Sequence, residues 1–132
     1  SHGHLYLDGG IADSIPIEHS EAKGNSKNVV ILTRDKSYRK GPNGAIRLLR
    51  CLYRRYPKLV SQMESRHIRY NQTLDYISKG EEEGRIFVIR PSSEVTVGRV
   101  EKSKEKLLAL YEQGYRDGEA SYQDLKIFLG LL

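Results

Sequence analysis

Two short hydrophobic runs that lack the alternation of a half-buried strand are the clearest pattern in the chain. They cover residues 28–33 and 85–90, and the first is rich in β-branched residues. Continuous apolar runs of this length are typical of strands covered on both faces, as in parallel sheets. Pro91 should end the second strand because proline has no backbone N–H. The pattern predicts a parallel sheet that contains both runs, with helices on its faces.

Helices are predicted before the first strand and between the two strands. Residues 17–23, which follow Pro16, predict a short helix. Apolar residues then recur at intervals of three and four over residues 44–56, namely Ala45, Leu48, Leu49, Leu52 and Tyr56. Pro57 should end that helix and begin a short one to residue 63, before a longer helix over residues 65–83.

The C-terminal part predicts two more helices. Residues 101–115 have an amphipathic pattern whose expected buried side comprises Leu107, Leu108, Leu110, Tyr111 and Tyr115. Asp117 and Gly118 should end this helix. Ser121 and Asp124 resemble a capping box for a last short helix. Cys51, between Leu49 and Leu52, is expected to be a small buried hydrophobic residue.

The order of these elements favours an α/β fold with a mostly parallel sheet. A third run at residues 5–7 could add one strand, whereas sheets usually have about 5–6 strands. The chain therefore resembles the C-terminal half of a doubly wound domain. Residues 1–4 are expected to be an expression remnant or disordered, residues 5–132 to form the half-domain, and about 44–83 to be an added helical segment.

Composition and charge narrow the function classes only modestly. The 132 residues carry a net charge of +5 and one cysteine, which favours an intracellular location and excludes an internal disulfide. No run is long enough to span a membrane, and we expect no signal peptide. A zinc site from His2, His4 and His19 is disfavoured by their spacing. We expect neither a metal nor a cofactor.

The candidate chemistry begins at Asp8, which follows the run at residues 5–7. Gly9 and Gly10 allow a sharp turn after it. A carboxylate at the C-terminal end of a strand lies where α/β sheets place ligands. Taken alone, Asp-Gly-Gly is more often a plain turn.

The wider context resembles the patatin-like phospholipase family, most strongly its bacterial branch. The residues that carry the resemblance are the Asp-Gly-Gly motif with Pro16, the strand at 28–33 followed by Arg34, Tyr56-Pro57, the stretch 70–74, the strand at 86–91 and the stretch 99–118. The resemblance implies a three-layer α/β/α fold and a serine lipid acyl hydrolase with a Ser/Asp dyad. It makes Asp8 the dyad aspartate, with Gly9, Gly10 and Pro16 supporting the turn.

The chain departs from that family in one decisive way. It has no Gly-x-Ser-x-Gly nucleophile motif and no Gly-rich oxyanion loop, which in the family precede the aspartate. We therefore expect a C-terminal fragment that is inactive alone and requires the N-terminal half of the same protein as its partner. An acyl ester or lipid would be the substrate.

A basic stripe offers a different function class. Arg47, Arg50, Arg54 and Lys58 are spaced to share one helical face, which could bind an anionic membrane surface or nucleic acid. The alternative is a solvated helix face. Nucleic acid ranks below the membrane because no nucleic-acid-binding motif accompanies the stripe.

Three further expectations concern partners and single residues. A non-catalytic module could form homo-oligomers through an exposed sheet edge beside residues 5–7 or through the apolar tail 127–132. His19 could reach a cleft but is more often a surface histidine. Asp13 is expected to cap the helix that starts at Pro16 rather than to act in catalysis.

Overall fold

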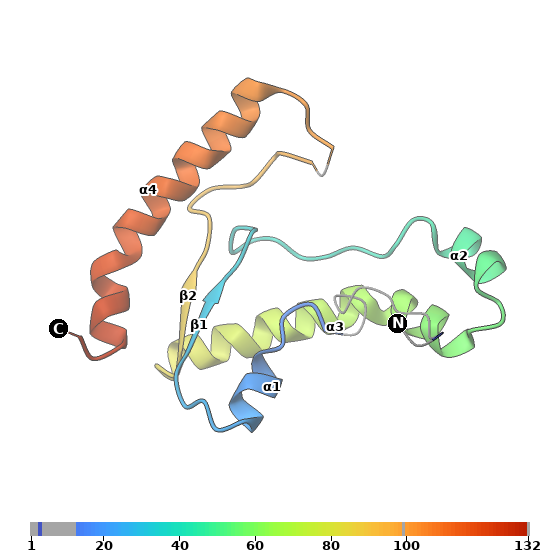
Figure 1. Ribbon diagram of the computed structural model, residues 1–132, viewed down its shortest axis with the longest axis horizontal. Helices are drawn as coiled ribbons and strands as arrows, with labels where there is room; N and C mark the ends of the chain where they lie inside the picture. The colour runs from blue at the N-terminus through green and yellow to red at the C-terminus, as the bar shows by residue number, and fades with distance from the viewer. Residues whose placement is uncertain (1–2, 4–12, 99, 132) are drawn as a thin grey trace.

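The computed structural model in Figure 1 describes residue 3, residues 13–98 and residues 100–131. Along the chain its elements are α1 (Ile17–Ala22), β1 (Asn28–Ile31), α2 (Ile46–Leu52), α3 (Pro57–Glu82), β2 (Ile86–Ile89) and α4 (Lys104–Phe128). Both strands lie inside the runs that predicted them. The mixed order confirms the α/β class in its coarse form.

The two strands pair in parallel, as predicted. Their register places Asn28 opposite Ile86 and Ile31 opposite Ile89. The Leu32 backbone N–H donates to the Ile89 carbonyl over 2.8 Å and continues the ladder past β1. Within the described residues the sheet has these two strands, and the predicted strand at residues 5–7 lies outside them. The described part is therefore smaller than the three-layer half-domain that the family resemblance implies.

The hydrophobic core lies on one face of the sheet, under α1 and α3 (Figure 1). Ile17 from α1, Val30 from β1, Ile77 from α3 and Ile86 from β2 form a buried cluster. Ile77 and Ile86 are the most deeply buried, at 1% and 2% exposure. Gly80 permits the close approach, because a Cβ there would lie 2.3 Å from Ile86 Cδ1. This small cluster fixes α1 and α3 to both strands.

The opposite face is covered only in part, by α4 (Figure 1). Phe87 of β2 packs against Phe128 with ring centroids 5.6 Å apart. Val29 and Ile31, which alternate with the buried Val30 along β1, remain 40% and 72% exposed. The prediction that β1 is covered on both faces is therefore wrong for the described residues. The helix α4 contacts β2 and does not extend across β1.

A second, polar cluster joins α1 to α3 at the amino ends of the strands. The Tyr76 hydroxyl donates a hydrogen bond to the Glu21 carboxylate, and Arg85 forms an ion pair with the same carboxylate. Arg85 also stacks over Tyr76 with its Cζ 4.8 Å from the ring centroid, and it pairs with Glu83 at 2.9 Å. Hydrogen bonding to the Glu21 carboxylate raises the pKa of Tyr76 above its ordinary value.

Two of the predicted helix boundaries are wrong in the same direction. The helix α3 begins at Pro57 and continues without the predicted break near residue 64. Likewise α4 runs through Asp117 and Gly118 to Phe128, so the predicted stop and the capping box at Ser121 and Asp124 do not form. The Ser121 hydroxyl instead donates to the Asp117 carbonyl over 2.9 Å, the back-bond of a residue inside a helix.

The predicted buried faces of two helices are also wrong. In α2 and the turn after it, Leu48, Leu52 and Tyr56 are exposed, and so is Cys51. The expected inner side of α4 is exposed at Leu107, Leu108, Tyr111 and Tyr115, and Leu110 is only partly buried. Among the described elements, α2 packs mainly on α3, and α4 packs on β2 with Phe128, at its C-terminal end, against Phe87. The amphipathic spacing predicted that these segments are helical, but it did not predict whether another element packs on their apolar faces.

Candidate functional site

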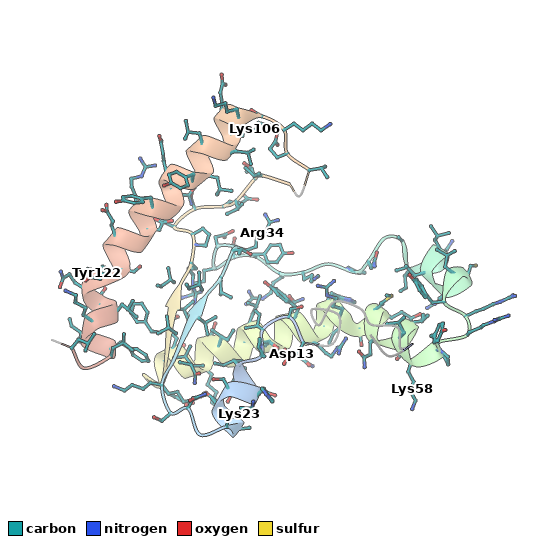
Figure 2. The ribbon with its side chains drawn as sticks, in the orientation of Figure 1. Asp13, Lys23, Arg34, Lys58, Lys106 and Tyr122 are labelled. Carbon is teal, nitrogen blue, oxygen red and sulfur yellow. The ribbon has the colours of Figure 1, made fainter. Side chains whose placement is uncertain are left out.

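The described residues gather polar side chains at the carboxyl edge of the strand pair. Arg34 follows β1 and Arg90 follows β2 directly, and both line one cavity at this edge with Leu32. Figure 2 places Arg34 just beyond the end of β1. The carboxyl ends of parallel strands are where α/β sheets bind ligands, because side chains from successive strands converge there. The remaining wall of the cavity comes from α3 and the loop after β1.

The loop after β1 is held in place by Arg34. The Arg34 guanidinium donates to the Val95 carbonyl over 2.9 Å and lies over the Tyr38 ring at 5.4 Å from its centroid. Tyr38 in turn meets Tyr70 of α3 edge to face, with centroids 6.2 Å apart. Burial raises the pKa of Tyr70 above its ordinary value. Arg34 thus connects β1, the loop that follows β2 and, through two aromatic rings, α3.

Two further contacts join this loop to α3. The Lys40 backbone and the Asn71 side chain exchange hydrogen bonds of 2.8 and 3.0 Å, which ties the loop to the middle of the helix. Arg39 pairs with Asp75 at 3.4 Å, and both side chains are largely exposed. Because exposed ion pairs contribute little to stability, the two hydrogen bonds between the Asn71 side-chain amide and the Lys40 backbone are the stronger attachment.

The charges in the cavity are unevenly balanced. Four cationic side chains line it, Arg34, Lys36, Arg39 and Arg90, together with one carboxylate, Asp35. The Ser37 hydroxyl donates to Asp35 and lowers the pKa of this carboxyl below its ordinary value, so it is ionised at neutral pH. Arg90 has a further carboxylate partner outside the lining, Glu81, at 3.2 Å. The excess of cationic side chains lets the arrangement attract an anion.

The sequence pattern predicts only a basic loop over residues 34–42 and does not by itself connect this loop with Arg90. The signal was available, because Arg34 comes directly after the first predicted strand and Arg90 is the last residue of the second. Strands that run in parallel end at the same edge, so residues that follow them become neighbours. The contribution of Tyr38 and Tyr70 could not be found this way, since it depends on how the loop turns back over α3.

The residues predicted for catalysis lie mostly outside the described part. Asp8, Gly9 and Gly10 are in the range that the structure does not describe. Pro16 precedes α1 as its N-cap residue, and no side chain caps this helix. The prediction that Asp13 caps α1 is therefore wrong, and Asp13 is exposed.

Of the three histidines considered for a zinc site, the structure describes His19. His19 is an exposed residue of α1, on the surface as the alternative interpretation expected. Across residues 13–98 and 100–131 no group of three His, Cys, Asp or Glu side chains could hold a metal ion. His2 and His4 are not among the described residues.

The predicted basic stripe does not share one helix. Arg47 and Arg50 belong to α2, which ends at Leu52, whereas Arg54 lies in the following turn and Lys58 in α3. Arg50 forms an ion pair with Glu64 of α3, which raises its pKa. All four cations are exposed. Figure 2 shows the Lys58 side chain pointing away from α3.

Fold and site together define a small α/β unit with a cationic edge, and comparison then gives its family. A model described as "Domain of unknown function (DUF6363)" matches residues 56–130, more than half of the chain. The chain therefore belongs to the DUF6363 family. No curated protein and no solved structure matches it. No helix in the described ranges has the length and apolar character needed to cross a bilayer.

The matched segment cuts through the sheet. It begins at Tyr56, just before α3, and ends at Gly130, just after α4, so it contains β2 but not β1. The β2 strand has its hydrogen-bonding partner in β1, and the core needs Val30 and Ile17 from the preceding segment. The family region thus packs as one unit with the residues that precede it.

Proposed function

We propose that this chain is the part of a patatin-like acyl ester hydrolase that supplies the dyad aspartate, Asp8. The observation that carries the proposal is that α1, the helix following the Asp-Gly-Gly motif, packs Ile17 into the core of the parallel pair. A strand, a helix and a parallel strand in this order form the unit in which the first strand ends at the carboxyl edge. An aspartate that ends the run at residues 5–7 would then face that edge.

The chemistry follows from the weakness of serine as a nucleophile. A base must accept the serine hydroxyl proton while the oxygen attacks the ester carbonyl, and the alcohol leaves when the tetrahedral intermediate collapses. An ordinary aspartate is a weak base, with a pKa of about 3.9. Partial burial in a closed cleft would raise that pKa and strengthen the base. The serine and the oxyanion donors would come from a segment with a Gly-x-Ser-x-Gly motif.

The test is an ester hydrolysis assay on the full-length gene product, with and without Asp8→Asn. Asparagine keeps the shape but cannot accept the proton, so kcat should fall by about 10²–10⁴-fold. Asp13→Asn is the matched control, because it changes a nearby exposed aspartate and should leave kcat unchanged. The 132-residue chain alone should not turn over a nitrophenyl ester.

Three results would contradict the proposal. One is full activity in a folded Asp8→Asn protein, and another is robust turnover by the isolated chain. The third is the absence of any Gly-x-Ser-x-Gly motif in the protein that supplies this segment. Circular dichroism of each variant separates a loss of catalysis from a loss of fold.

One observation favours a second candidate, attachment to an anionic membrane surface. Leu48, Leu52 and Tyr56 are 61%, 67% and 55% exposed, next to the cations Arg47 and Arg54. Exposed apolar and cationic side chains on a short helix and the turn after it are the composition of an interfacial segment. Figure 1 places α2 at the end of α3 that lies away from the sheet, where a membrane could approach it.

Vesicle co-sedimentation tests this second candidate. The assay is run at low salt, because contacts between charges are screened over about 8 Å at physiological salt. Changing Arg47, Arg50, Arg54 and Lys58 to glutamine should then remove most binding to anionic vesicles. Glutamine at Lys104, Lys106, Arg116 and Lys126 of α4 is the charge-matched control. Binding that ignores salt, or that the α4 variant loses equally, would contradict it.

A further inference from the structure

We propose that the cavity at the carboxyl edge of β1 and β2 is a binding site for a phosphate group. The inference does not depend on the hydrolase proposed above, because it uses only described residues and a ligand equilibrium. Its walls come from the two residues that follow the strands, from the loop after β1 and from α3. The site is therefore built from segments that the core holds in place.

The first argument is charge. Arg34 and Lys36 line the cavity without an ion pair to a carboxylate among the described residues, whereas Arg39 and Arg90 pair with Asp75 and Glu81. The charge of Arg34 also helps to lower the pKa of Asp35, so Asp35 offsets part of that charge. The single acid in the lining, Asp35, accepts its hydrogen bonds from Ser37. Two cations are thus available to a ligand, and the exposed Arg39–Asp75 pair is weak enough to exchange. A phosphate group carries between one and two negative charges at neutral pH.

The second argument is geometry. A guanidinium presents its N–H groups as a planar fork that matches two phosphate oxygens, and Arg34 uses one nitrogen for the Val95 carbonyl. That bond and the Tyr38 ring orient the fork before any ligand binds, which lowers the entropy lost on binding. Phosphate has enough oxygens to meet Arg34 and Lys36 from different directions, whereas a carboxylate has two.

The third argument is size. The cavity leaves about 20 Å³ for the centre of a water-sized sphere. That is room for a water molecule or a compact group and far less than the ~300 Å³ or more of a typical drug-sized pocket. Leu32, Leu74 and Ile77 form its apolar floor. An acyl chain or a nucleobase would not fit in this space, whereas one oxygen of a phosphate group, free or at the end of a larger molecule, would enter it.

The test is a titration of the full chain with inorganic phosphate, followed by amide chemical shifts. Shifts should saturate at residues 33–39 and 90 and remain small over residues 47–58. Arg34→Gln should weaken binding by about tenfold or more, because a charge-assisted hydrogen bond is lost. Arg34→Lys keeps the charge but not the planar guanidinium, so its affinity for phosphate should lie between those of the unaltered chain and Arg34→Gln. Arg54→Gln, the same charge change in the turn after α2, should bind like the unaltered chain.

A second variant and a second probe complete the design. Lys36→Gln changes an exposed side chain, keeps the Arg34–Val95 bond and should weaken phosphate binding while the melting temperature stays constant. Vesicles of phosphatidylcholine with phosphatidic acid distinguish the source of the phosphate. If Arg34→Gln weakens binding to these vesicles, the phosphate belongs to a lipid head group. If Arg34→Gln leaves vesicle binding unchanged while the chain still binds inorganic phosphate saturably, the ligand is a soluble phosphate compound.

Either source supports the site. The proposal is overturned if inorganic phosphate gives no saturable shifts at residues 33–39 and 90. It is also overturned if the shifts spread equally over residues 47–58, or if Arg54→Gln weakens binding as much as Arg34→Gln does. Because no result depends on ester hydrolysis, failure here leaves the hydrolase proposal standing, and the reverse also holds.

Discussion

The two long helices have nearly the same length and very different surroundings. The helix α3 has 26 residues, of which Val60, Leu74, Ile77 and Gly80 are buried, whereas α4 has 25 residues and none is buried. Both pack on β2, from opposite faces of the sheet (Figure 1). The difference lies in what else each helix meets. On its face of the sheet, α3 shares a buried core with α1 and β1, while α4 packs on β2, with Phe128 against Phe87, and buries none of its residues fully.

This contrast shows that amphipathic spacing and burial are separate properties. The apolar residues of α4 recur at helical intervals, yet Leu108, Tyr111 and Tyr115 are more than half exposed. Exposed apolar side chains gathered on one helix are typical of a surface that a partner covers. The face under α3 should therefore determine the stability of the chain, and the face under α4 should tolerate change.

The largest expected effect comes from the centre of the α3 face. Ile77→Ala removes a side chain that is 1% exposed, so it loses buried contacts and leaves a cavity. The free energy of unfolding should fall by about 2–5 kcal/mol. Urea denaturation measures it. Leu108→Ala is the matched control on α4, and its expected change is within about 0.5 kcal/mol. Equal losses for the two variants would remove the contrast between the faces.

A glycine-to-alanine substitution sharpens the comparison because the same methyl group is added on each helix. At Gly80 the new Cβ would lie 2.3 and 2.8 Å from two Ile86 atoms, in a side chain that is itself 2% exposed. Overpacking of this kind costs about 1–3 kcal/mol, so Gly80→Ala should lower the free energy of unfolding.

The same change on α4 should have the opposite sign. A Cβ at Gly114 meets no atom within 4 Å, and alanine is the better helix former by about 0.5–1 kcal/mol. Gly114→Ala should therefore raise the free energy of unfolding slightly. Thermal melts of both variants provide the measurement. Destabilisation by Gly114→Ala would show that another surface lies against α4 in solution.

The smallest effect concerns pH and the Tyr76–Glu21–Arg85 cluster on the α3 face. The pKa of Tyr76 is raised in the folded chain by its hydrogen bond to Glu21. Its contribution to stability is complete below about pH 10, the unfolded value, and is lost as the pH rises through the folded pKa. Denaturation at pH 9 and pH 11 should show a decline that Tyr76→Phe reduces. If the stability of Tyr76→Phe declines by the same amount between pH 9 and pH 11, the decline is caused by other titratable groups.

The sequence predicted the parts of the fold that depend on local pattern. Non-alternating β-branched residues around Val30 and Ile86 predicted two strands in parallel, and that pairing is confirmed. The helix ends were harder to predict, because a glycine such as Gly118 lowers helix stability by only about 1 kcal/mol, which neighbouring contacts can offset. The exposure of Leu48 and Leu108 could not be predicted, since burial depends on elements distant in sequence.

The candidate site was only partly predictable, for the same reason. Arg34 and Arg90 each follow a strand, so their convergence could be inferred from parallel pairing. The contacts of Arg34 with Val95 and Tyr38 arise from two loops that fold back over the edge, and no local pattern indicates them. The basic stripe from Arg47 to Lys58 relied on one continuous helix, and α2 ends too early for that.

Native-state hydrogen exchange on the full chain tests most directly the central claim that one face of the sheet holds this fold. We expect the slowest amides in β1, β2 and residues 74–82 of α3, with exchange limited by global unfolding. Amides of residues 104–124 in α4 should exchange faster by local opening, and Ile77→Ala should accelerate the slow set far more than the fast one. Equal protection of α3 and α4 would contradict the claim.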